Sequence, residues 1–222
     1  MVKITDLCEC PFCNYDENLS LMGKIRNFLS SSMPKSIIEI PILIFSVPIL
    51  ICSYFWAKKG KTCVERYKNV VCPNEERAIF IINHQNSIKN LYVLGSGVAF
   101  LVSYFKSNSI KFKIYDCYNP DDFYTAIKES KAQNLWIFGH GNRHCISFGK
   151  DGRFPFCKIV GVERKSFIAQ FHCCHQNGKS LWEYLSDKPG IFSEGYRNVV
   201  QNRMDVEKWV KDNQVQSKKL KS

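Results

Sequence analysis

Residues 134–141 read NLWIFGHG, residues 166–175 read SFIAQFHCCH, and these two stretches decide the fold. Each contains a short apolar run bounded by polar residues, which is the pattern of a β-strand buried on both faces. Each run ends in side chains that can carry acid–base or nucleophilic chemistry: His140 after the first, Cys173 and Cys174 after the second. The two stretches therefore predict core strands with reactive residues at their ends.

Two more strands are predicted on the amino-terminal side. Residues 78–83 read AIFIIN, a continuous apolar run that ends in a polar residue, as a buried parallel strand does. Residues 111–115 read KFKIY and alternate between polar and apolar side chains, which indicates a further strand. The sequence thus predicts at least four strands.

Helical patterns and one hairpin separate these strands. Residues 87–106 carry apolar side chains at helical spacing and predict a single helix. A second helix is predicted after Asn119, a good N-cap residue that is followed by Pro120 at the first helical position. Residues 149–152 (GKDG) predict a hairpin turn, and a third helix is expected to begin near Ser180.

The predicted order of elements is strand, helix, strand, helix, strand, hairpin, strand, helix. This alternation is typical of an α/β fold with a mostly parallel sheet and helices on both faces, a three-layer arrangement. Right-handed crossovers bring the carboxyl ends of such strands to one edge of the sheet, where ligands bind. We therefore expect His140 and residues 172–175 to meet at that edge.

His140 and a cysteine at 173–174 have the chemistry of a Cys–His dyad. A thiol becomes a nucleophile when a neighbouring base or cation lowers its pKa, and an imidazole at the next strand end provides that base. Gly141 directly follows His140, and its backbone N–H, together with that of the nucleophile, can form an oxyanion hole. These residue types predict nucleophilic attack on a carbonyl group.

The order of the motifs resembles the group of cysteine peptidases that contains caspases, legumain, gingipains and clostripain (clan CD). LWIFGHG is similar to the group's apolar strand ending in His-Gly, FIAQFHCC to its strand ending in the nucleophilic cysteine, and AIFIIN to its first strand, which ends in Asn. The resemblance spans Arg77 to Ser186. It implies a caspase-like fold, expected over residues 77–200, and a cysteine endopeptidase activity that needs no cofactor.

By this resemblance His140 is the base, Gly141 is an oxyanion donor, and the nucleophile is one of two adjacent cysteines. Cys173 ends the apolar strand directly and is favoured. Cys174 is the alternative nucleophile, although it would face the other side of the sheet if the strand continued. The glycine that relatives often place soon after the cysteine comes late, at Gly178, and no arginine-lined pocket is recognisable, so substrate preference is open.

Two other functions fit the same stretch. One is a non-catalytic signalling or scaffold domain with the caspase-like fold. The other is a zinc protein, because imidazoles and thiolates are ligands that zinc prefers. The residues concerned are His140, His144, His172, Cys173, Cys174 and His175. Adjacent residues of a strand point to opposite faces and no pair has a zinc-finger spacing, so no metal is assigned to this cluster.

A separate metal site is an alternative for the amino-terminal cysteines. Cys8, Cys10 and Cys13 follow the pattern C-x-C-x-x-C, and Cys63 or Cys72 could complete a ligand set. The other interpretation is a set of reduced cysteines in a small head, or disulfides if the head lies outside the cell.

One segment has the composition of a transmembrane helix, predicted over residues 36–57. Ile40 to Ala57 read IPILIFSVPILICSYFWA, eighteen residues without a charge. At a helical rise of 1.5 Å per residue they extend about 27 Å, enough to cross the bilayer core. Five basic residues between positions 58 and 68 outnumber three between 24 and 35, so a single-pass protein with a cytoplasmic carboxy-terminal domain is expected.

The remaining boundaries follow from composition. We expect a small cysteine-containing head at residues 1–35, the membrane segment at 36–57, a basic connector at 58–76, the caspase-like domain at 77–200 and a polar basic tail at 201–222. Residues 1–20 have neither the basic start nor the apolar core of a signal peptide, which favours a reduced, intracellular main domain.

The formal net charge of +11 suits a membrane surface or nucleic acid. No zinc-finger, helix-turn-helix or RNP pattern supports nucleic acid as a partner. The expected partners are therefore a protein or peptide substrate and a membrane.

Overall fold

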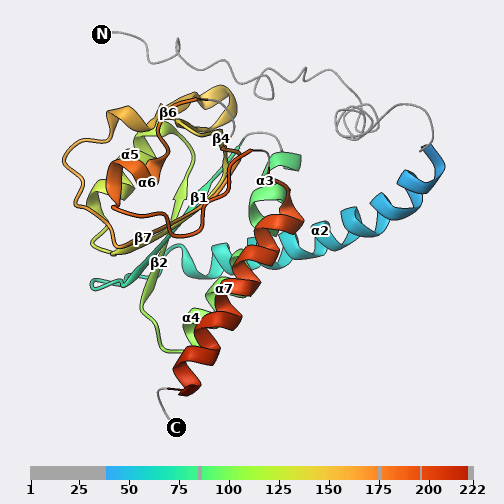
Figure 1. Cartoon of the computed structure of the whole chain (residues 1–222), viewed down its shortest axis with the longest axis horizontal. Coiled ribbons are helices and arrows are strands. Elements are labelled where there is room, and N and C mark those ends of the chain that lie inside the picture. Colours follow the sequence, from blue (N-terminus) through green and yellow to red (C-terminus); the bar gives the residue numbers. More distant parts are fainter. Residues whose placement is uncertain (1–38, 85–86, 175–176, 196, 220–222) are drawn as a thin grey trace. The chain divides into compact units, whose positions relative to one another are not determined.

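The structure is a computed structural model, and it describes residues 39–84, 87–174, 177–195 and 197–219 (Figure 1). For residues 39–50, 87–88 and 215–219 it describes the backbone only. The chain divides into two compact units, and everything from Ser53 onward belongs to one of them. That unit holds the α/β domain and the candidate site.

The helices are α2 (Glu39–Tyr67), α3 (Ser87–Gly95), α4 (Val98–Ser107), α5 (Pro120–Glu129), α6 (Leu181–Leu185) and α7 (Val199–Lys219). The strands are β1 (Arg77–Ile82), β2 (Phe112–Cys117), β3 (Asn134–Phe138), β4 (His140–Asn142), β5 (Cys145–Ser147), β6 (Arg153–Pro155) and β7 (Phe167–Phe171). Two single 3-10 turns, η1 (Gly149–Asp151) and η2 (Phe156–Lys158), flank β6.

The main sheet has the strand order β2-β1-β3-β7, and every neighbouring pair is parallel. The four predicted strands are confirmed within one or two residues. Strands β1, β3 and β7 are buried along almost their whole length, whereas the alternating strand β2, at the edge of the sheet, is only half buried. Strands β3 and β7, which carry the two stretches that decide the fold, lie side by side. The predicted α/β fold with a mostly parallel sheet is confirmed.

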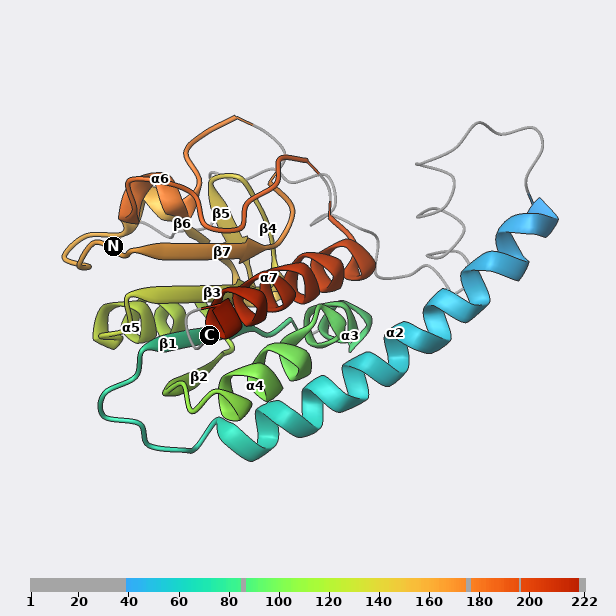
Figure 2. The same cartoon turned by 60° about the horizontal axis from the view of Figure 1, so that its bottom comes forward.

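Helices cover both faces of this sheet, which makes three layers (Figure 2). Alternate side chains of β3 enter two separate apolar clusters. Leu135 and Ile137 pack on the side of α5 and α6. Trp136 and Phe138 pack on the side of α3, α4, α7 and the carboxy-terminal half of α2.

The predicted single helix over residues 87–106 is wrong, because the chain breaks at Ser96 and Gly97 into α3 and α4. Gly97 has a φ of 102°, in the left-handed region that glycine tolerates best. An added Cβ there would lie 3.0 Å from the Cβ of Val206 in α7. The break therefore lets α7 pack closely against the corner between the two helices.

The predicted polar tail at residues 201–222 differs from what is observed. Helix α7 covers most of this range, and Val206 and Val210 are buried in the core. The Trp209 ring packs edge-on against Trp136 at 4.6 Å between centroids. The overall polarity of the segment hides the narrow apolar stripe that docks it, so the domain extends beyond residue 200.

The basic connector predicted at residues 58–76 is also partly built into the domain. Helix α2 continues to Tyr67, and Ala57 and Val64 are buried. The predicted transmembrane segment at 36–57 falls mainly on residues whose side chains lie outside the description, as does the predicted head at 1–35. Within the part of the chain that was described, no helix is long and apolar enough to cross a membrane.

A small antiparallel sheet of β4, β5 and β6 leaves the end of β3. The hairpin predicted at residues 149–152 joins β5 to β6, whereas β4 was not predicted. The fully buried side chain of Asn142 closes the first turn by accepting from the N–H groups of His144 and Cys145, both at 3.1 Å. This turn fixes the backbone directly after His140.

The substitution Gly60→Ala is expected to destabilise the domain, although alanine is the better helix former. In an exposed helix the change would stabilise by about 1 kcal/mol. Here an added Cβ would overlap the carbonyl oxygen of Leu94, so α2 and α3 must move apart. We expect the free energy of unfolding, measured by urea titration, to fall by about 1–3 kcal/mol.

The exposed neighbour Lys59 provides the control. Lys59→Ala should change the free energy of unfolding by less than about 0.5 kcal/mol. A stabilised Gly60→Ala variant would mean that α2 does not pack on α3 at this point.

Candidate active site

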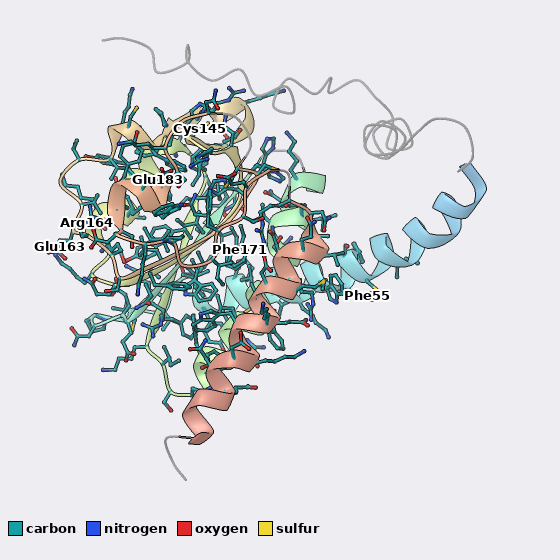
Figure 3. The ribbon with its side chains drawn as sticks, in the orientation of Figure 1. Phe55, Cys145, Glu163, Arg164, Phe171 and Glu183 are labelled. Carbon is teal, nitrogen blue, oxygen red and sulfur yellow. The ribbon has the colours of Figure 1, made fainter. Side chains whose placement is uncertain are left out.

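The ends of β3 and β7 bring His140 and Cys173 to the same edge of the sheet. Phe138 pairs with Phe171, and the N–H of Gly139 donates to the carbonyl of Phe171 at 3.3 Å, so the pairing continues past the strands. His140 and Cys173 each come two residues after this pair. Figure 3 labels Phe171 at the end of β7.

His140 is held between two groups of the segment that follows β1. Its ring packs on Tyr92 of α3 at 4.9 Å between centroids, and Nε2 lies 3.0 Å from the carbonyl oxygen of Lys89. A carbonyl oxygen can only accept, so Nε2 carries the proton and Nδ1 is left as the basic nitrogen. The ring of His84 stands edge-on to His140 at 5.9 Å.

Burial lowers the pKa of His140 to about 3. The hydrogen bond to the Lys89 carbonyl acts in the opposite direction, while the nearby charges of Lys89 and His84 lower the pKa further. The imidazole is therefore neutral at physiological pH, which is the form that can accept a proton.

Cys173 is half-buried, and its Sγ lies 3.9 Å from the carbonyl oxygen of Arg197, just before α7. The hydroxyl of Tyr92 donates to the same oxygen at 2.7 Å. Since the Tyr92 ring also packs on His140, the three side chains form one cluster on the α3 and α7 face of the sheet.

Cys174 belongs to the opposite face. It is 2% exposed, and its Sγ lies 3.5 Å from the carbonyl oxygen and 3.8 Å from Nδ1 of His172. Its backbone pairs with Gly195, to whose carbonyl the Cys174 N–H donates at 2.8 Å. Burial raises the pKa of Cys174 to about 12, which keeps it a thiol. Of the two cysteines, Cys173 is the one whose Sγ approaches the Arg197 carbonyl that Tyr92 also contacts, whereas the Sγ of Cys174 contacts His172.

His172 has a structural role. It is fully buried, with Nε2 2.9 Å from the side-chain nitrogen of Gln170 and Nδ1 3.0 Å from the carbonyl of Cys173. Burial lowers its pKa to about 4. His172 thus fixes the backbone of Cys173 from the face opposite to His140.

Gly141 lies in β4, opposite Ile146 of β5. A Cβ at this position would overlap the carbonyl oxygen of Cys145, which is labelled in Figure 3. Packing within the hairpin is therefore a sufficient reason for glycine at this position. The role of Gly141 as an oxyanion donor stays a prediction.

The zinc alternative requires several ligand side chains around one metal ion. In the described ranges, no group of three or more His, Cys, Asp or Glu side chains is placed to hold a metal ion. His144, one of the candidate ligands, has Nδ1 3.0 Å from the carbonyl of Asn177 and so ties the loop after β7 to the hairpin. Residues outside the description include His175, Cys8, Cys10 and Cys13.

Three residues of the site were not predicted. His84 follows a buried strand just as His140 does, and that position is a signal that could have identified it. Tyr92 and Arg197 carry no such signal, because one lies within a helix and the other in a loop 105 residues further on.

Two surface hollows lie away from the cluster. One of about 200 Å³ is lined by residues of α2, α3, α4 and α7, including Trp56 and Arg203. The other, of about 350 Å³, lies at the outer strand β2 and includes Tyr118. Neither is lined by His140 or Cys173.

A scan against protein-family models finds no matching family, and a search of curated proteins finds no relative of this chain.

Acidification should destabilise the fold through His172. Its pKa in the folded state, about 4, lies below the ordinary 6.5, so below pH 6.5 the unfolded chain takes up a proton that the folded chain does not. Stability is therefore complete above pH 6.5 and falls between about 6.5 and about 4. At pH 5 we expect this histidine to cost about 2 kcal/mol.

Urea midpoints at pH 7 and pH 5 measure this effect. His172→Gln should remove this part of the pH dependence, leaving that of His140 and other groups. If the variant loses as much stability as the wild type between these pH values, His172 does not stay neutral in the fold.

Proposed function

We propose that the chain is a caspase-like cysteine peptidase in which Cys173 is the nucleophile and His140 is the general base. The observation that carries the proposal is the β3–β7 register. His140 and Cys173 each follow the paired Phe138 and Phe171 by two residues. The ring of His140 packs on Tyr92, and the thiol of Cys173 approaches the Arg197 carbonyl to which Tyr92 donates.

The chemistry follows from the tautomer of His140. Nδ1 takes the proton from Cys173 Sγ as the sulfur attacks the carbonyl carbon of the scissile bond. The imidazolium then gives this proton to the leaving amine, which departs with the electron pair of the C–N bond. Water, deprotonated by the same imidazole, hydrolyses the thioester and restores the thiol.

Gly141 is proposed to stabilise the tetrahedral intermediate. A residue without a side chain allows the substrate oxygen to approach its backbone N–H, and the N–H of the nucleophile is the second donor. This role is compatible with the packing reason for glycine at this position.

A non-catalytic signalling or scaffold role is the second candidate. It is favoured by one observation: the thiol of Cys173 rests against the Arg197 carbonyl, an acceptor that stabilises the protonated, unreactive form.

Trapping with a peptidyl acyloxymethyl ketone separates the two functions. Such a reagent alkylates a thiol that an imidazole activates, so we expect a single adduct at Cys173. His140→Ala should slow its formation by about 100-fold or more, the usual contribution of a general base. Mass spectrometry of proteolytic fragments locates the adduct.

The chain contains its own controls for this experiment. Cys157 is an exposed thiol and reports non-specific alkylation, and Cys174→Ala should leave the adduct at Cys173 unchanged. Equal labelling of Cys157 and Cys173, or labelling that does not depend on His140, would favour the non-catalytic role.

We also propose that residues 36–57 anchor the protein in a membrane, so that its substrates lie near one. The support is the uncharged run from Ile40 to Ala57 and the basic residues after it. The full chain should remain in the membrane pellet after alkaline carbonate washing. Val47→Lys should release much of it, because a lysine at the centre of a span costs about 3 kcal/mol, whereas Lys59→Gln should not.

A further inference from the structure

A buried polar cluster lies behind the candidate dyad and joins α3 to the start of α7. The side-chain N–H₂ of Asn202 donates to the hydroxyl of Tyr92 and to Oγ of Ser96, both at 3.2 Å. The Asn202 carbonyl oxygen accepts from Nε of Arg197, and the Arg197 guanidinium also pairs with Asp205. Ser96 and Asn202 are fully buried, so these bonds are shielded from water.

This cluster contacts both members of the dyad through Tyr92. The ring of Tyr92 supports the imidazole of His140, at 4.9 Å between centroids. The hydroxyl of Tyr92 and the thiol of Cys173 approach the same oxygen, the carbonyl of Arg197, at 2.7 and 3.9 Å.

We propose that Tyr92 is a positioning residue for the His140–Cys173 pair, an inference that rests on the function proposed above. Its ring sets the plane of the base. Its hydroxyl donates to the Arg197 carbonyl, which would otherwise accept a stronger hydrogen bond from the thiol of Cys173. The thiol therefore stays available for proton transfer to His140.

The sharing of one acceptor carries this argument. The Tyr92 bond is short, and the thiol contact is long and weak at 3.9 Å. Without the hydroxyl, the thiol no longer competes with Tyr92 for the Arg197 carbonyl, and its hydrogen bond strengthens. A stronger bond to the neutral form disfavours ionisation of the thiol.

The surroundings keep the Tyr92 hydroxyl a donor. Burial raises the pKa of Tyr92 far above its ordinary value, and nearby Cys173 and Cys174 raise it further, whereas Arg197 acts in the opposite direction. The hydroxyl is therefore protonated throughout the range in which a cysteine titrates.

The test is the pH dependence of Cys173 alkylation by iodoacetamide in the full chain, followed by mass spectrometry. Tyr92→Phe keeps the ring on His140 and removes only the hydroxyl. We expect the rate at pH 7 to fall about three- to tenfold, the usual weight of one hydrogen bond. The pH of half-maximal rate should rise correspondingly.

Tyr104→Phe is the matched control. Tyr104 is also a helical tyrosine on the same face of the sheet, and within the described part of the chain its hydroxyl makes no hydrogen bond. This variant should keep the wild-type profile. A purely structural role of Tyr92 would lower the free energy of unfolding without moving the profile, so a folded Tyr92→Phe variant with the wild-type profile overturns the proposal.

A second variant covers the case in which Tyr92→Phe does not fold. Asn202→Asp preserves the shape and the acceptor for Arg197, but the introduced carboxylate draws the Tyr92 hydroxyl away from the Arg197 carbonyl. The profile should move in the same direction, and an unmoved profile in the folded variant overturns the proposal.

His140→Ala separates this inference from the proposed function. If trapping by the peptidyl acyloxymethyl ketone depends on His140 while Tyr92→Phe leaves the iodoacetamide profile unchanged, only the role of Tyr92 fails. If that trapping does not depend on His140, the proposed function fails and the role of Tyr92 falls with it.

Discussion

The parallel pairing of β3 with β7 is the constraint on which the candidate site depends. Phe138 lies opposite Phe171, and the bond from Gly139 to the Phe171 carbonyl carries the pairing past the ends of both strands. Because side chains alternate between faces, a slip of one residue would turn Cys173 away and bring Cys174 to the face of His140. The register therefore decides which of the two cysteines lies on the side of His140.

Packing on both faces sets that register. On one face the rings of Phe138 and Phe171 stack at 4.6 Å, and Trp136 stacks on Phe171 at 6.0 Å. On the other face the side-chain oxygen of buried Gln170 accepts from the backbone N–H of Trp182 at 3.0 Å. A slipped strand would move this amide among aromatic rings without a partner, at a cost of about 1–3 kcal/mol.

The sheet and the positions of His140 and Cys173 at its strand ends could be predicted from the sequence, whereas the side chains that contact these two residues could not. Apolar runs such as residues 134–138 mark buried strands, and strand order then brings their ends together. Tyr92 and Arg197 could not be found this way, since their contact joins segments 105 residues apart. The docking of α7 was hidden because only a narrow stripe, including Val206 and Val210, is apolar in an otherwise polar helix.

Burial also shapes how a dyad of this kind would work. The environment that lowers the pKa of His140 to about 3 opposes an imidazolium, and the Arg197 carbonyl beside Cys173 opposes a thiolate. The imidazole of such a dyad is then neutral at rest, unlike that of a preformed ion pair. Proton transfer must accompany attack on the substrate, whose developing oxyanion supplies the counter-charge that the protein interior does not. In such a site, reactivity depends on a bound acyl group more than on the thiol alone.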